Sequence, residues 1–118
     1  RRLKPVKSAS NWLLDTVKNT LTSPDGVDIK VTGSETLLLK ELVLHGRFAT
    51  HDDLISYVGN PDKDEESNKL RIEVLISRLR KKLSPYVDPS LFINVLRGRG
   101  YQLKIQVELK NIAPAKND

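Results

Sequence analysis

The sequence predicts an α+β fold with a small antiparallel sheet near the N-terminus, three helices in the middle and a β-hairpin after them. Three observations support this order. Short alternating runs occupy residues 11–31, and three runs with apolar residues at helical spacing follow. A long alternating run preceded by a turn rich in glycine comes last.

Length and composition limit the class of protein. A chain of 118 residues is long enough for one domain with its own hydrophobic core. It contains no cysteine, which excludes disulfides, Cys-ligated zinc and a thiol nucleophile, and no apolar run reaches the roughly 18 residues of a spanning helix. We therefore expect a cytoplasmic protein. The net charge of +5 and the pI of about 9.6 predict a polyanionic partner.

The N-terminal part predicts strands after a short linker. Residues 1–8 are basic, contain a proline and show no period, so we expect them to be a linker remnant. Candidate strands occupy 11–15 and 17–22, and 27–31 alternate strictly between apolar and polar side chains. The segment 23–26 contains a proline, which fixes φ, and a glycine, which accepts a positive φ. It predicts a turn inside a small antiparallel sheet.

Two helices are predicted from their first residues. A threonine followed three residues later by an acidic residue is a capping-box signal. After Thr32 it predicts a helix over 33–45, and after Thr50 a helix over 51–58. Residues 59–66 begin with Gly-Asn-Pro and continue with acidic side chains, which predicts a loop.

The third helix is predicted over residues 67–83 and has two different faces. Apolar residues at i, i+3, i+4 and i+7 predict a buried face formed by Ile72, Leu75, Ile76, Leu79 and Leu83. The opposite face is mainly basic and carries Arg71, Val74, Arg78 and Lys82, with Ser77, Arg80 and Lys81 beside them. We expect the basic face to be exposed.

A hairpin is predicted after the third helix. Residues 91–96 favour a strand, and Tyr101 begins a run to Leu109 that alternates between apolar and polar residues. Between them, residues 97–100 read Arg-Gly-Arg-Gly and predict a turn with arginines at its tip. The domain is therefore expected over 9–110. Residues 111–118, which show no pattern, are expected to be a frayed tail.

Charges of opposite sign are separated along the chain. Residues 51–66 hold six acidic residues against one lysine, whereas residues 67–104 hold nine basic residues against two acidic ones. A surface without a particular task usually mixes the two signs. The separation therefore predicts two surfaces with different partners.

Strands, two helices, a longer basic helix and a hairpin with arginines at its tip follow the order of a winged helix-turn-helix. A helix fits the major groove of DNA, and a hairpin wing beside it can place an arginine in the minor groove. Two stretches, IEVLISRLRKKL at 72–83 and INVLRGRGY at 93–101, closely resemble the C-terminal effector domain of OmpR/PhoB-type response regulators. The capped segment with LLKEL at 38–42 resembles the first helix of that family.

The resemblance implies sequence-specific binding of double-stranded DNA by a bacterial transcription regulator of two-component systems. The recognition helix would be 67–83. By position, the resemblance implies base contacts from Val74 and Arg78, and phosphate contacts from Arg71, Ser77, Arg80 and Lys81. It assigns the minor-groove contact to Arg97 of the wing, with Arg99 as a second wing arginine.

The resemblance also implies partners other than DNA. Regulators of this type contact RNA polymerase through the loop between the second and third helices, which here contains Asp62, Asp64, Glu65 and Glu66. They commonly bind tandem half-sites as dimers. An upstream receiver or other regulatory domain is expected to precede these 118 residues.

Two other classes of function were weighed against DNA binding. A winged-helix module could dock its basic face on an acidic protein surface, and a sequence preference among DNA duplexes would separate the two hypotheses. For an enzyme, no set of nucleophile, base and orienting group is present, so we expect no catalytic residue, cofactor, metal or small-molecule substrate. His51 carries no metal or base role in this interpretation, and helix positions account for His45, at the end of the first helix, and for Asp52 and Asp53, in the first turn of the second.

Overall fold

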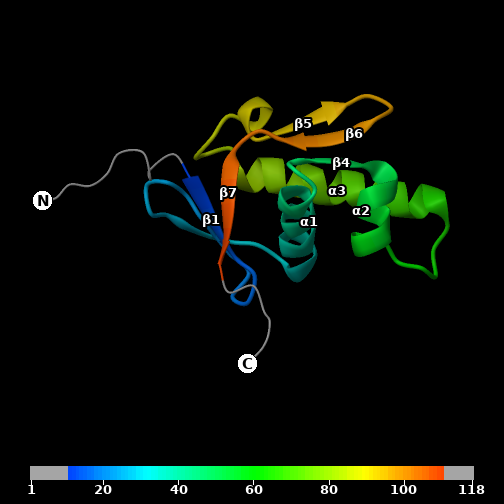
Figure 1. Cartoon of the computed structure of the whole chain (residues 1–118), viewed down its shortest axis with the longest axis horizontal. Coiled ribbons are helices and arrows are strands. Elements are labelled where there is room, and N and C mark those ends of the chain that lie inside the picture. The colour runs from blue at the N-terminus through cyan, green and yellow to red at the C-terminus, as the bar shows by residue number, and fades with distance from the viewer. Residues whose placement is uncertain (1–10, 111–118) are drawn as a thin grey trace, which may run out of the picture.

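The structure, a computed structural model, describes residues 11–110. The expected linker remnant at 1–8 and the expected tail at 111–118 lie outside the described residues. Figure 1 shows a sheet at one end of three helices and a hairpin that lies along the longest helix. The predicted α+β class with its three helices and terminal wing is confirmed.

The N-terminal sheet has four strands in the order β3-β2-β1-β7. Strands β1 (Asn11–Asp15), β2 (Thr20–Thr22) and β3 (Asp28–Lys30) pair antiparallel, as predicted. The strand predicted over 17–22 is shorter, because Asp15 Oδ1 accepts hydrogen bonds from the backbone of Val17 and Lys18 and holds a turn there. The small antiparallel sheet predicted for this region gains a parallel partner, since β7 (Gln106–Lys110) from the run that ends at Leu109 pairs with β1.

The long run from Tyr101 to Leu109 forms two strands instead of the single predicted one. Strand β6 (Gly100–Leu103) belongs to a second sheet with order β4-β6-β5, whereas β7 crosses to the N-terminal sheet. Between them, the Lys104 amide donates to the carbonyl oxygen of Phe92 over 2.7 Å. The chain bends between β6 and β7 because the two strands belong to different sheets.

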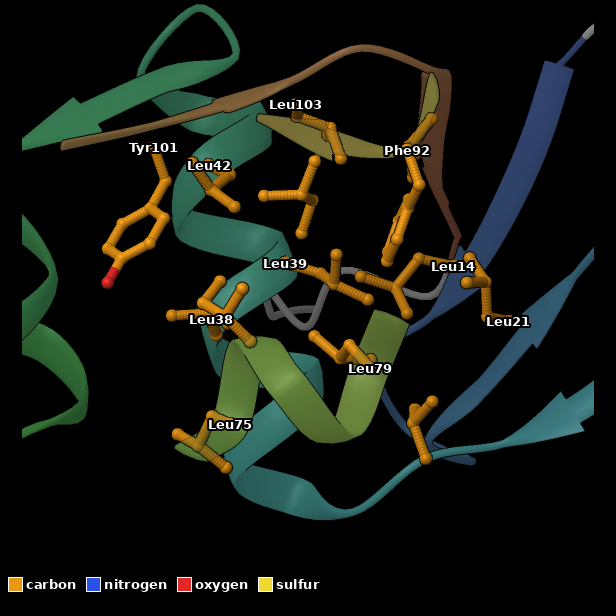
Figure 2. Packing of buried hydrophobic residues seen from close by; sticks show 14 of the residues in the cluster. Leu14, Leu21, Leu38, Leu39, Leu42, Leu75, Leu79, Phe92, Tyr101 and Leu103 are labelled. Atoms are coloured by element: carbon orange, nitrogen blue, oxygen red, sulfur yellow. The ribbon is translucent and has the colours of Figure 1, made fainter. Parts of the chain in front are cut away.

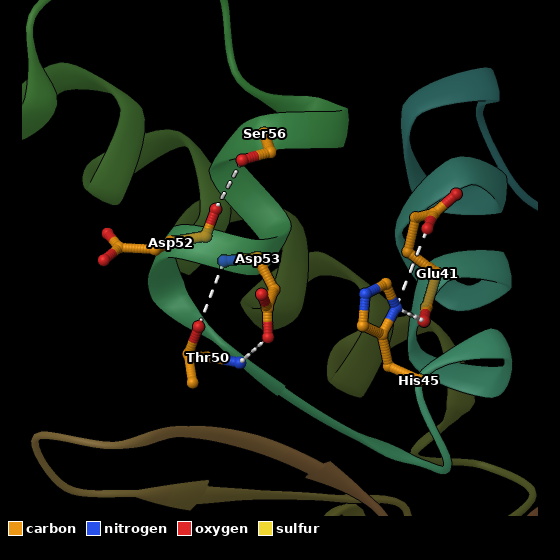
Figure 3. A network of polar contacts seen from close by, with 6 residues as sticks. All are labelled: Glu41, His45, Thr50, Asp52, Asp53 and Ser56. Atoms are coloured by element: carbon orange, nitrogen blue, oxygen red, sulfur yellow. Dashed lines mark hydrogen bonds and ion pairs between the residues drawn. The ribbon is translucent and has the colours of Figure 1, made fainter.

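Helices α1 (Gly33–Leu44) and α2 (His51–Val58) confirm the two predicted caps. In Figure 3, the Thr50 hydroxyl accepts from the Asp53 amide, and the Asp53 carboxylate accepts from the Thr50 amide. The same figure shows the histidine after α1, whose Nδ1 donates to the carbonyl oxygen of Glu41 over 2.8 Å. The same carbonyl oxygen accepts the His45 amide over 3.0 Å, so the His45 ring is a second donor at the C-terminal end of α1.

A strand absent from the sequence analysis joins the first two helices. Strand β4 (Phe48–Thr50) is three residues long and pairs with β6, with Ala49 opposite Tyr101. It is too short to show a period of its own. This pairing attaches the start of α2 to the wing.

Helix α3 (Glu65–Leu83) begins two residues before the predicted start at 67. Its N-cap is Asp64, whose Oδ1 accepts from the Ser67 amide over 2.8 Å. Glu65 and Glu66 therefore lie in the first turn of α3 and not in the predicted loop. Acidic side chains are favourable there because of the positive end of the helix dipole.

The wing consists of β5 (Ile93–Leu96) and β6. The strand predicted over 91–96 starts later, because η2 (Pro89–Leu91) forms a 3-10 turn capped by Asp88. The strands pair antiparallel with Leu96 opposite Gly100, which leaves residues 97–99 as the turn.

The hydrophobic core lies between α1, α3 and the two sheets. Figure 2 shows Leu38 and Leu39 of α1 on the side of Leu75 and Leu79 of α3, with Leu42 of α1 nearer Tyr101 and Leu103. Leu14 and Leu21 close this cluster from the N-terminal sheet, and Phe92, Tyr101 and Leu103 close it from the wing side. The apolar face predicted for the third helix is the buried one, which leaves the opposite face outside.

Candidate nucleic-acid interface

The outward face of α3 is polar at both ends and apolar in the middle. Its exposed residues recur at spacings of three and four, so they share one side of the helix: Ser67, Leu70, Arg71, Val74, Ser77, Arg78 and Lys81, with the exposed Glu73 at the edge of this side beside Ser77. The predicted base-reading residues Val74 and Arg78 are both on this face, and the Val74 side chain is 37% exposed. A length of about 28 Å for 19 residues lets the face span a major groove.

The four residues of α3 that were predicted to contact phosphate differ in how far they are exposed to solvent. Ser77 and Lys81 are exposed, and Arg80 is half-buried beside the wing. Arg71 Nε donates to the carbonyl oxygen of Val58 over 3.1 Å, and one terminal nitrogen donates to Ser34 Oγ over 3.0 Å. Arg71, predicted as a phosphate contact, thus also ties α3 to the first two helices.

Lys82 does not belong to the free basic face on which the sequence placed it. Its Nζ lies 2.6 Å from Oε1 of Glu35, and that carboxylate is completely buried. Glu35 Oε1 also accepts the Thr32 amide as part of the cap of α1. Lys82 therefore connects the C-terminal half of α3 to the first turn of α1.

The wing turn lies beside α3 and forms a groove with it. The groove has a volume of about 600 Å³ and is lined by Val95, Arg97 and Gly98 of the wing and by Glu73, Ile76, Ser77 and Arg80 of α3. Arg97 and Arg99 are both exposed, and the Arg99 amide donates to the carbonyl oxygen of Leu96 to close the turn. Arg80 and Arg97, predicted separately, thus border one groove.

Comparison with known proteins identifies the domain. Residues 26–103 match the family model described as "Transcriptional regulatory protein, C terminal", which is the OmpR/PhoB type. The chain belongs to this family. The match includes α1, α2, α3 and the wing, so it covers both sides of the groove.

Curated relatives of this OmpR/PhoB-type domain are longer proteins. The chain is 31% identical over 104 residues to the transcriptional regulatory protein GltR of Pseudomonas aeruginosa, covering 86% of this chain and 42% of that protein. It is 30% identical over 103 residues to the regulatory protein VirG of Agrobacterium tumefaciens, covering 86% of this chain and 38% of that one. The chain therefore spans about two fifths of the length of these relatives.

Solved structures share the fold of the OmpR/PhoB-type domain. The DNA-binding domain of CpxR from E. coli is 29% identical, with a TM-score of 0.58, covering 80% of this chain and 87% of that one. The Klebsiella pneumoniae RstA DNA-binding domain, solved in complex with the RstA box, is 27% identical with a TM-score of 0.53. That alignment covers 74% of this chain and 84% of the RstA chain.

Two polar residues of the groove were missed by the sequence analysis. Glu73 lies one turn before Ser77 on α3, so its helical spacing alone would have placed it at the groove. His51 packs edge-on against Tyr101, with ring centroids 5.1 Å apart. Its role was not visible in the sequence, because that contact depends on the pairing of β4 with β6. Because Glu73 and His51 both line the groove, its lining is not purely basic.

Tyr101 is buried at the floor of this groove. Burial raises the pKa of its phenol above the ordinary value of 10.0, and the negative charge of Glu73 raises it further. The native state therefore disfavours the phenolate, so this contribution to stability is complete below pH 10 and is lost as the pH rises through the native pKa.

This shift predicts an alkaline titration that depends on Tyr101. In the native protein, the Tyr101 phenol should ionise above its ordinary pKa of 10.0, as followed by the ultraviolet absorbance of the phenolate. The Tyr101→Phe variant keeps the ring and should lack that step. A step of unchanged position and size in this variant would show that another tyrosine causes it.

The acidic segment predicted as a polymerase contact is exposed throughout. Asp62 lies in the loop between α2 and α3, Asp64 caps α3, and Glu65 and Glu66 occupy the first helical turn. The hydrogen bond from the Ser67 amide lowers the pKa of Asp64 below its ordinary value of 3.8. All four residues lie at or before the first turn of α3, and the basic residues of α3 follow them. The acidic surface is therefore next to the N-terminal end of the basic one.

Residues 11–110 contain no group of three or more His, Cys, Asp or Glu side chains placed to hold a metal ion. None of the helices in this range combines the length and the apolar character that a membrane crossing requires.

Proposed function

We propose that this domain binds double-stranded DNA in a sequence-specific manner as the output domain of a bacterial two-component transcription regulator. The observation that carries the proposal is the shared groove: Arg80 of α3 and Arg97 of the wing line it together. A helix in the major groove and a wing arginine in the adjacent minor groove require these elements on one side of the molecule. DNA binding places the domain in the cytoplasm.

Different residues contribute affinity and specificity in this proposal. Arg78 forms a bidentate contact with guanine, and Val74 packs against the methyl group of a thymine, because both side chains stand on the outward face of α3. Arg71, Ser77, Arg80 and Lys81 contact phosphates, which carry no sequence information themselves. Arg97, with Arg99 beside it, enters the minor groove.

Selection of random duplexes followed by sequencing tests the proposal. Wild-type protein should enrich one sequence, whereas a module that docks on acidic proteins should enrich none. Arg78→Ala should lose about 1 to 3 kcal/mol of discrimination at a single base pair. Arg80→Ala should weaken all sequences alike and reduce the slope of log affinity against log salt by about 1. Unchanged selection and affinity in both variants would contradict the assignment of this face.

We further propose the partners that regulators of this type use. Two copies bind tandem half-sites after phosphorylation of a receiver domain, and the acidic segment contacts RNA polymerase. Exposure of Asp62, Asp64, Glu65 and Glu66 supports the polymerase contact. Transcription in vitro with these residues changed to asparagine or glutamine should fall while DNA affinity is kept. No catalytic step is assigned to the domain.

A further inference from the structure

Leu70 is an exposed leucine on the face of α3 that carries the predicted base readers. Its side chain is 60% exposed, more than the 37% of Val74 one turn later. The buried face of α3 lies on the opposite side of the helix, so Leu70 contributes little to the core.

On one side of Leu70 the surface combines an apolar centre with a cationic edge, and on the other side Leu70 borders Glu66, Lys69 and Glu73. Leu70 and Val74 line a shallow groove of about 320 Å³ together with Ser67, Arg71, Leu75 and Arg78. The two exposed apolar side chains are four residues apart, hence neighbours on one helical stripe. Arg78 continues this stripe one turn further.

We infer that Leu70 is a specificity-determining residue that packs against the methyl group of a thymine in the major groove. The inference rests on the proposed function and adds one base contact to those proposed for α3. The C5 methyl of thymine is the apolar group that the major-groove edge of a base pair presents. Leucine has no hydrogen-bonding group, so its contact with a base edge favours that methyl group over polar atoms, whose loss of water would go uncompensated.

Helix geometry limits where this thymine lies. Four residues of α-helix advance about 6 Å along the axis, and stacked base pairs are about 3.4 Å apart. Leu70 and Val74 therefore face base pairs that are adjacent or separated by one. Because Arg78 is another turn along, the half-site contains two thymines on one side of the guanine that Arg78 reads.

Uracil tests this contact, since it differs from thymine only by the missing methyl group. In the duplex obtained by selection, each thymine is replaced in turn by uracil, and affinity is measured by fluorescence anisotropy. Wild-type protein should bind about fourfold more weakly at two positions, the ratio expected for one buried methyl group. In the Leu70→Ala variant, uracil should no longer weaken binding at the position farther from the guanine, but it should still weaken binding at the nearer position.

Leu44→Ala is the matched control. Leu44 is 57% exposed on α1, so the same substitution removes a similarly exposed side chain from another helix. It should keep both responses to uracil. Alanine favours helix more than leucine does, so circular dichroism should show that both variants are folded.

The outcomes separate this inference from the function on which it rests. Wild-type protein that is indifferent to uracil on that side of the guanine would overturn the inference, and so would Leu70→Ala that keeps both responses. If Arg78→Ala still relaxes the guanine preference in those cases, DNA recognition stands without Leu70. Selection that enriches no sequence would reject the proposed function itself.

Discussion

Replacing Gly100 with alanine is expected to destabilise the domain by about 3 to 5 kcal/mol. Gly100 begins β6 with a φ of +152°, and an added Cβ would lie 2.2 Å from the carbonyl oxygen of Ala49 and 2.7 Å from Cα of Thr50. Both atoms are backbone atoms of β4, so no side chain can rotate away. The strands would have to separate, which displaces the cap of α2 and the wing together.

Gly98→Ala is the control within the same turn. Gly98 has a φ of +68°, but an added Cβ would meet no atom within 4 Å. Its replacement should therefore cost only the left-handed backbone conformation, about 1 to 2 kcal/mol. Urea unfolding followed by circular dichroism compares the two midpoints. Equal midpoints would show that the close approach of β4 contributes nothing at Gly100.

The contrast between these glycines shows what local sequence can predict. The turn at 97–100 was predicted because glycine tolerates positive φ, and this reasoning applies to Gly98. The reason for Gly100 lies in β4, a strand of three residues whose partner is about fifty residues away in the sequence. Local patterns do not contain that pairing.

Helix starts were predictable because capping residues lie within a few positions of the helices they begin. Both capping boxes are present, and the third helix was misplaced only because Asp64 was not considered as its cap. The break between β6 and β7 was not predictable from the alternation, which continues through it. Tyr101, Leu103 and Val107 are all buried, yet they belong to two sheets.

For the candidate site, helical spacing placed Arg71, Val74 and Arg78 on the outward face of α3 correctly, but the predicted face omitted the exposed Leu70 and wrongly included Lys82. Helical spacing could not predict which cations on α3 have partners within the protein. Arg71 bonds to Ser34 and Val58, and Lys82 bonds to Glu35, all of them from other helices. Such partners depend on how α3 packs across α1, which the periodicity of α3 does not specify.

Lys82→Met is expected to destabilise the domain by about 2 to 4 kcal/mol. Methionine keeps much of the apolar stem but removes the ammonium group that lies 2.6 Å from the buried Glu35 carboxylate. The second oxygen of that carboxylate has no hydrogen-bond partner among residues 11–110. Without the Lys82 ammonium, the Glu35 carboxylate would keep only the hydrogen bond from the Thr32 amide in the cap of α1. The estimate lies below that for a fully buried pair because Lys82 is 35% exposed.

A double-mutant cycle tests whether the charge of Glu35 causes this loss. Glu35→Gln removes the charge but keeps an oxygen for the Thr32 amide. Combined with Lys82→Met, it should destabilise the protein by less than the sum of the single changes, because the unpaired buried charge is gone. Unfolding free energies that add without an interaction term would mean that the ion pair contributes nothing.

Lys81 provides the comparison that connects this pair to DNA binding. Lys81 is exposed on the outward face of α3, so Lys81→Met should change stability by no more than about 0.5 kcal/mol. It should nevertheless weaken DNA binding, since we propose a phosphate contact there. Lys82→Met should show the reverse at a temperature where both variants are folded: reduced stability with retained affinity. Equal losses of affinity would mean that the Lys82 ammonium also reaches DNA and that α3 presents a wider basic face than its packing indicates.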